Sequence, residues 1–468
     1  MVNFFEEFKP IRNNIRKFNL WDILHELYKI QKGKHIPEIL EFIYLNSIVY
    51  SSEYKNIKLK HPEREWSKLI NGTNELHEKI NALWINEDVW GFLHKQYLNQ
   101  LKAKPHHPFN HLYRHYFIFS HKKLSSHIER MLGISYHDFF LCAWWIHSVF
   151  DKKTYKKPKA YFFQEKNKDT SISSENINTT LETLSINLTN LKTQLKEQMR
   201  YDMCTFITHE YEHIKRPILE SGDYLYCLYP DMLLNQLTSG VYYLSKIYDN
   251  SNNLNNSFGL CFEQYVGIVL GKCKTNKLKI TKELKFNRGQ NKTSDWIVED
   301  NGSIVFIECK TKRLKIESKK YEDIVESDIG SMVDAAFQVY KVFHHYSNNE
   351  IPGLNFQQNK YFIPMIITLE EWYAGIPDLN EEIKKRLKVK LKSSGIEPSL
   401  VEQYKFRITS ISNFELDIQM MSKFGFKEYY DGIKSGKIDK DKFDFKTFFL
   451  EEIEHAILTP LQEQFEDN

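Results

Sequence analysis

Nineteen residues, SDWIVEDNGSIVFIECKTK at 294–312, constrain the fold of this chain more than any other stretch. Two runs rich in Ile and Val flank the dipeptide Asn301-Gly302. This dipeptide is favoured in two-residue type I′ hairpin turns, because both residues take a positive φ there. A hairpin closed in this way pairs residues that are equally far from the turn. It therefore places Asp295 directly opposite Glu308.

The predicted hairpin brings three charged side chains to one face of a sheet. Residues directly opposite in an antiparallel pair have Cβ atoms about 4.5–5.5 Å apart, and Lys310 projects from the same face as Glu308. Two facing carboxylates repel each other unless a positive charge lies between them. Mg²⁺ suits such a small shell of oxygen ligands that retains water. Asp295, Glu308 and Lys310 thus predict phosphodiester hydrolysis, with the metal as Lewis acid and the lysine offsetting phosphate charge.

The organisation of the chain follows from its patterns of apolar residues. At 468 residues, its length favours two to four domains. Residues 1–200 read as helices only, with apolar positions three and four apart and a leucine stripe up to Leu195. A small α+β connection is expected at 201–257 and a helical tail at 426–468. Between them, 258–425 alternates helix, three strands, helix and strand, which indicates an α/β layer with a mixed sheet.

The charged residues of the hairpin carry a resemblance to a known family. Asp295, twelve intervening residues and Glu308-Cys309-Lys310, on a hairpin after a helix and a strand, resemble the PD-(D/E)XK nuclease superfamily. The resemblance covers roughly 258–425. It implies a restriction endonuclease-like core in the C-terminal half, while the helical pattern of residues 1–200 predicts an all-α N-terminal domain beside it. It also implies that Asp295 and Glu308 bind Mg²⁺, with Mn²⁺ as a substitute, that Lys310 is catalytic, and that Cys309 contributes its main-chain carbonyl.

Further residues extend the resemblance. Glu263 matches a glutamate that many members carry on the helix before the sheet, and Gln338 matches an accessory glutamine of some members on the helix after the lysine. Ser294 stands where the motif's name has proline, which is a common variation. Lys312 and Arg313 follow the strand and are candidates for phosphate contacts, with a solvated strand end as the alternative.

A competing motif is His209-Glu210-x-x-His213, which on a helix places two imidazoles on one face for zinc, with the glutamate as general base. Pro217 and a β-like stretch follow at once and leave little room for such a helix. A zinc metalloprotease is therefore the less favoured interpretation. The E-x-K pattern alone also carries little weight in a chain with 27% charged residues, because it recurs away from any paired strand.

Composition indicates the compartment. The six cysteines form no C-x-x-C pair, which fits reduced thiols in a cytosol. The longest apolar run, at 139–150, falls short of the roughly 20 residues that a membrane span needs. We therefore expect a cytoplasmic protein without a membrane partner. Because 64 Lys and Arg nearly balance 61 Asp and Glu, any nucleic-acid surface must be a local patch.

The resemblance implies a metal-dependent endonuclease that cuts DNA, most simply double-stranded DNA, as an effector of bacterial antiviral defence. The N-terminal domain would recognise a trigger, the nucleic acid, a companion defence protein or a second copy of the chain. RNA stays open as a substrate, since the metal site attacks a phosphate and does not read the sugar. The alternative is a catalytically silent protein on the same fold that binds nucleic acid or a partner.

Overall fold

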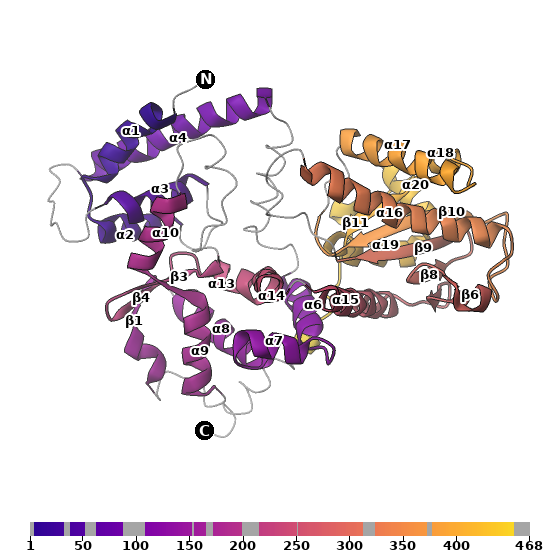
Figure 1. Ribbon diagram of the computed structural model, residues 1–468, viewed down its shortest axis with the longest axis horizontal. Helices are drawn as coiled ribbons and strands as arrows, with labels where there is room; N and C mark the ends of the chain where they lie inside the picture. Colours follow the sequence, from indigo (N-terminus) through magenta and orange to yellow (C-terminus); the bar gives the residue numbers. More distant parts are fainter. Residues whose placement is uncertain are drawn as a thin grey trace. The chain divides into compact units, whose positions relative to one another are not determined.

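The computed structural model describes residues 4–31, 38–51, 62–87, 108–151, 154–164, 172–198, 215–249, 251–311, 323–371 and 377–453 (Figure 1). The chain forms two compact units. The first comprises Met1–Pro108, Ser125–Asp249 and Ile453–Asn468, and the second comprises Phe109–Leu124 and Asn250–Glu452. Among the described helices, none is long and apolar enough to cross a membrane.

The first unit is mainly helical. Its helices are α1 (Phe4–Ile15), α2 (Leu20–Gln31), α3 (Glu38–Tyr50), α4 (Pro62–Glu87), α7 (Ser125–Leu132), α8 (Tyr136–Asp151), α9 (Ser174–Leu184), α10 (Leu188–Gln198), α13 (Asp231–Asn235) and α14 (Val241–Tyr248). It also contains a four-stranded sheet in the order β1-β4-β3-β2. These strands are β1 (Lys156–Pro158), β4 (Tyr224–Tyr226), β3 (Ile218–Ser221) and β2 (Ser185–Asn187).

The prediction of a helical N-terminal region is confirmed for most of its described residues, but not in two places. Strands β1 and β2 lie within 1–200, so this region is not all-α. The leucine stripe is interrupted where Ser185 takes an extended conformation after α9. Asn187 then accepts the N–H of Thr189 at 2.9 Å and begins α10. Short polar side chains that bond nearby backbone favour helix ends over helix interiors, which explains the break.

The segment expected to connect two domains belongs to the first unit. Strand β3 pairs with β2, and β4 pairs with β1, so residues after 215 complete the small sheet. The compact units divide the chain between Asp249 and Asn250. A cut at 257 would fall inside α15 (Asn252–Lys272). The asparagine-rich residues 252–256 form the start of α15, which Ser251 caps by accepting the N–H of Leu254.

The second unit is built on a five-stranded mixed sheet in the order β11-β10-β9-β8-β5. Strands β5 (Lys279–Lys282), β8 (Trp296–Glu299) and β9 (Ser303–Lys310) are antiparallel, and β10 (Tyr361–Thr368) and β11 (Arg407–Ser410) run parallel to β9. The expected order of helix, three strands, helix and strand is thus present as α15, β5, β8, β9, α16 (Asp323–Ser347) and β10. The α/β class with a mixed sheet is confirmed.

The chain contributes further helices to this unit. They are α6 (Pro108–Ser120), α17 (Pro377–Ser393), α18 (Leu400–Gln403), α19 (Ile411–Phe424), α20 (Phe426–Lys434) and α21 (Leu450–Ile453). Ile304 and Phe306 of β9 join one buried cluster with Met332 and Val339 of α16. Because side chains alternate along a strand, Glu308 and Lys310 project from the same face as these two β9 residues. The face beneath α16 therefore carries both core and candidate site.

The turn between β8 and β9 differs from the expected one. Neither Asn301 nor Gly302 has a positive φ, so the turn is not type I′. Instead, the Asp300 carboxylate accepts the N–H groups of Gly302 and Ser303. Its second oxygen accepts the N–H of Phe426 at 2.8 Å. An aspartate that bonds the backbone ahead of it forms such a turn without positive φ, and here it also anchors the start of α20.

Pro364 lies in β10 before this strand begins to pair with β11, so its missing N–H leaves no hydrogen bond unmade. The N–H groups of Tyr361 and Leu369 point toward β9, where they donate to Gly302 and Lys310. Even-numbered residues of β10 therefore point toward β11. Strand β11 begins to pair only at Met365, so no ladder hydrogen bond is lost at Pro364.

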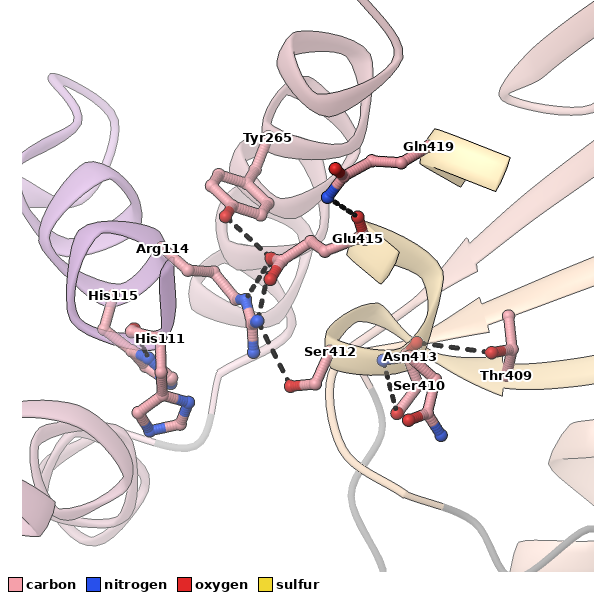
Figure 2. Close-up of polar contacts among 10 residues, drawn as sticks. All are labelled: His111, Arg114, His115, Tyr265, Thr409, Ser410, Ser412, Asn413, Glu415 and Gln419. Atoms are coloured by element: carbon pink, nitrogen blue, oxygen red, sulfur yellow. Dashed lines mark hydrogen bonds and ion pairs between the residues drawn. The ribbon is translucent and has the colours of Figure 1, made fainter. Parts of the chain in front are cut away.

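Helix α6 comes from the first quarter of the chain but belongs to the second unit. Arg114 is buried, and its Nη2 donates to Glu415 Oε1 of α19 at 2.8 Å and to Ser412 Oγ at 3.2 Å (Figure 2). The Tyr265 hydroxyl of α15 donates to the same Glu415 oxygen at 2.8 Å. One buried carboxylate thus joins α6, α15 and α19.

Candidate functional site

The register of β8 and β9 is the one predicted. Trp296 pairs with Ile307 and Glu299 with Ile304, so the next pair toward the open end is Asp295 and Glu308. The carbonyl of Asp295 accepts the N–H of Glu283 and thus points away from β9. Asp295 and Glu308 therefore occupy a non-hydrogen-bonded position of the ladder, where facing side chains come closest.

Hydrogen bonds hold these two carboxylates in place. The N–H of Cys309 donates to Asp295 Oδ2 at 2.7 Å. Within a strand, the N–H and C=O of one residue point to the same side, so the Cys309 carbonyl also points toward β8. Lys310 Nζ donates to Glu308 Oε1 at 2.8 Å and to Gln338 Oε1 of α16 at 3.1 Å. The structure thus brings together five residues that the sequence singled out.

Glu263 approaches this group from α15. Its carbonyl accepts the indole N–H of Trp296 at 3.0 Å, and its carboxylate lies 3.5 Å from Lys282 Nζ. Close packing of α15 on β8 depends on Gly267, where a Cβ would lie 2.2 Å from the Trp296 ring. Burial, followed by the charge of Asp295, raises the pKa of Glu263 even though Lys282 lowers it. Glu263 therefore belongs to the same electrostatic group.

The electrostatics reflect crowding of negative charge. Burial and then the charge of Glu308 raise the pKa of Asp295 to about 7, although the Cys309 N–H opposes this. Burial also raises the pKa of Glu308, against the effect of Lys310. Burial lowers the pKa of Lys310, but its hydrogen bond to Glu308 and the two nearby carboxylates outweigh that, so the pKa is raised overall. Lys310 is thus a permanent cation at neutral pH.

Glu283 is a member of the group that sequence reasoning missed. Its negative charge raises the pKa values of Asp295, Glu308 and Glu263. It directly follows β5 and donates its N–H to the carbonyl of Asp295 at 2.9 Å. The signal that could have found it is the antiparallel pairing of β5 with β8. A second hairpin, at 284–294, separates the two acids, so no tight turn reveals their pairing in the sequence.

The donor set of the site suits a divalent cation. Within the described ranges, no group of three or more His, Cys, Asp or Glu side chains is arranged to hold a metal ion. The oxygens of Asp295, Glu308 and the Cys309 carbonyl are nevertheless the hard ligands that Mg²⁺ prefers. The raised pKa values indicate that burial and mutual repulsion disfavour the charged carboxylates. Two carboxylates and a carbonyl therefore fit a cation that keeps several waters.

Other candidates from the sequence lie outside the described residues. They are Lys312 and Arg313, proposed for phosphate contacts, and His209, Glu210 and His213 of the zinc motif. The structure places none of these side chains.

Comparison with protein-family models finds no match to this chain. Comparisons with curated proteins and with solved structures find no match either.

Proposed function

We propose that this chain is a Mg²⁺-dependent endonuclease of the PD-(D/E)XK type that hydrolyses phosphodiester bonds of DNA. The observation that carries the proposal is the pairing of Asp295 with Glu308 at a non-hydrogen-bonded position, beside Lys310. The order of helix, three strands, helix and strand supports a restriction endonuclease-like core. Mn²⁺ is expected to substitute for Mg²⁺.

Each residue of the site has a separate part in the proposed reaction. Asp295, Glu308 and the Cys309 carbonyl would hold the cation, which when bound supplies Lewis acidity at the phosphate. Lys310, held by Glu308 and Gln338, offsets negative charge on the phosphate and orients water. Its raised pKa makes it a poor proton acceptor. Glu263, whose pKa is raised, is better suited to orient the attacking water and accept its proton.

A basic helix supports nucleic acid as the substrate. Helix α17 lies beside α16 (Figure 1) and carries Lys384, Lys385, Arg386, Lys388, Lys390 and Lys392. Lys390 pairs with Asp334, which lies one turn before Gln338 on α16. The basic helix is thus connected to the candidate site through two successive turns of one helix. Five of the six basic side chains are ion-paired with acids, and the helix also carries Asp378, Glu381 and Glu382. Its excess of basic over acidic residues would attract phosphates on either side of the cleaved bond.

The test is metal-dependent cleavage of supercoiled plasmid, linear duplex, single-stranded DNA and tRNA by the full chain. We expect cutting of duplex DNA in Mg²⁺ or Mn²⁺, and none in EDTA or with a Glu308→Gln variant. Cutting of tRNA alone would assign RNA as the substrate instead. Duplex binding without cutting in either metal would favour the catalytically silent alternative. Peptide hydrolysis that depends on zinc would favour the metalloprotease.

The setting of this activity is also a proposal. A cytoplasmic nuclease suits antiviral defence, where the mainly helical first unit would recognise a trigger, a companion protein or a second copy. Infection of cells that carry the parent chain or its Glu308→Gln variant tests this. Equal phage yields from the two would argue against a defence role.

A further inference from the structure

A second hairpin projects beside the candidate site. Strands β6 (Lys285–Phe286) and β7 (Asn291–Lys292) pair with each other and join the ends of β5 and β8. Glu283 donates its N–H to the Asp295 carbonyl, and Lys285 pairs with Lys292. Between these pairs, Leu284 alone opposes both Thr293 and Ser294. This is a β-bulge at 293–294, directly before Asp295. Bulges bend a strand and are frequent beside active sites.

The hairpin is firmly attached. Leu284 and Thr293 exchange two hydrogen bonds of 2.9 Å at its base, one of them through the Thr293 hydroxyl. Phe286 is buried in the core cluster under α16, with its ring centroid 5.2 Å from that of His345. The hairpin therefore has a fixed position relative to Asp295.

The tip of the hairpin is exposed and conformationally unfavourable. Residues 287–290 are all exposed. Asn287 and Arg288 both have φ of 55°, and Gly289 follows with φ of 83°. Gly and Asn adopt this left-handed region readily, but for Arg it is costly. Within the described part of the chain, the Arg288 guanidinium has no hydrogen bond or ion pair. Its side chain thus contributes nothing to the fold that offsets its strained backbone.

We propose that Arg288 binds a backbone phosphate of duplex DNA close to the cleaved bond, a role that rests on the proposed nuclease function. Arg288 lies five residues beyond Glu283, a separation that spans at most about 17 Å even in fully extended chain. That length corresponds to about five nucleotides at about 3.4 Å each. Lys285, which is exposed, adds positive charge along the hairpin, whereas Lys292 is paired with Glu283 at 3.1 Å. A rigid, basic hairpin at this distance fits the duplex that flanks the site.

The test measures binding of a fluorescent duplex DNA by the full chain in EDTA, so that it is independent of cleavage. Loss of one phosphate contact should weaken binding about eightfold at about 0.1 M salt, and lower the slope of log K against log salt by about 0.9. We expect this for both Arg288→Asn and Arg288→Gly. Because Asn and Gly accept a positive φ, both variants should melt at or above the temperature of the parent.

The matched control is Lys437→Asn, which removes one exposed charge elsewhere in the second unit. Lys437 donates its N–H to Gly432 of α20, a helix whose start is anchored at the Asp300 turn rather than at Asp295. This control should bind DNA like the parent. The proposal is overturned if Arg288→Asn keeps the affinity and slope of the parent, if Lys437→Asn weakens binding equally, or if the parent does not bind duplex DNA. Cleavage by the parent, measured separately, would leave the nuclease proposal standing in each case.

Discussion

Asp295 and Glu308 face each other at a ladder position without backbone hydrogen bonds, and the Cys309 N–H holds the Asp295 carboxylate at 2.7 Å. The proximity has an energetic consequence in the absence of metal. Burial and Glu308 raise the pKa of Asp295 to about 7, far above the value of about 4 in an unfolded chain. The folded state therefore holds the proton more tightly. The stability that this proton contributes is fully present below about pH 4 and is lost as the pH rises to about 7.

Asp295→Asn should remove this loss, because Asn stays neutral and still offers an oxygen to the Cys309 N–H. We expect the variant to exceed the parent in free energy of unfolding by about 2 kcal/mol at pH 8, which is about half of the full linkage value because the side chain is partly exposed. The advantage should vanish near pH 4. Urea denaturation in EDTA at several pH values measures it. A variant less stable than its parent at pH 8 would contradict the proposed repulsion.

Glu299 of β8 provides a control of opposite sign. Its carboxylate lies 3.0 Å from Lys360 and 3.1 Å from Lys279. Burial raises the pKa of Glu299, but these two hydrogen bonds and charges outweigh it, and the pKa is lowered overall. Glu299 therefore contributes stability that is lost as the pH falls. Glu299→Gln should be less stable than the parent at pH 8, by about 1 kcal/mol.

Lys310 and Gln338 should differ in their effect on cleavage. Lys310→Ala removes the only cation that bonds directly to Glu308 among the described residues, so we expect cutting to fall at least about 100-fold. Gln338→Ala leaves that cation in place and removes one of its two hydrogen bonds, so a loss of about tenfold or less is expected. Initial rates on duplex DNA in Mg²⁺ separate the two. Equal losses in the two variants would argue against a direct role for Lys310.

Gly267 should be required for the position of Glu263. A Cβ there would lie 2.2 Å from the Trp296 ring, whose N–H bonds to the Glu263 carbonyl. Gly267→Ala should therefore cost about 1–3 kcal/mol and reduce cleavage. On the same helix, a Cβ at Gly259 would meet no described atom within 4 Å, so Gly259→Ala should be neutral or stabilising. Thermal melting of both variants tests whether Gly267 is required for packing, and equal melting temperatures would contradict this.

Much of the candidate site can be predicted because it lies on one hairpin. The register of β8 and β9 follows from residues adjacent in sequence, and it places Asp295 against Glu308. The type I′ turn expected from Asn-Gly is wrong, because an Asp300 side chain that bonds forward closes the same loop without positive φ. Glu283 escapes prediction since its pairing with Asp295 lies beside a bulge, which leaves no clear periodic signal.

Contacts between distant segments are the hardest to predict. Nothing in the sequence of α6 indicates that Arg114 pairs with Glu415, 301 positions later. An aromatic helix with one arginine fits equally well as part of the N-terminal bundle. The partner of a buried charge is set by tertiary packing, which a single sequence does not reveal.

Removing either member of the Arg114–Glu415 pair should destabilise the fold, whereas removing both members together should not. Both side chains are about 2% exposed. Arg114→Met leaves a buried carboxylate that still accepts the Tyr265 hydroxyl but has lost its cation, and Glu415→Leu leaves a buried guanidinium. Each single change should cost about 3–5 kcal/mol, because an unpaired buried charge is not compensated.

The double variant Arg114→Met/Glu415→Leu should recover most of this loss, since two apolar side chains of similar size need no charged partner, and only the Tyr265 hydroxyl loses its acceptor. Lys384→Ala, which breaks a pair with the exposed Glu381 on α17, serves as the control and should cost far less than either single change. Chemical denaturation of the parent, the two single variants and the double variant completes the double-mutant cycle, and Lys384→Ala is measured in the same way. If Arg114→Met were as stable as Lys384→Ala, the buried pair would not hold α6 in the second unit. If the double variant were stable and both single variants were not, α6 would dock through packing, and the single variants would fail because each leaves an unpaired buried charge.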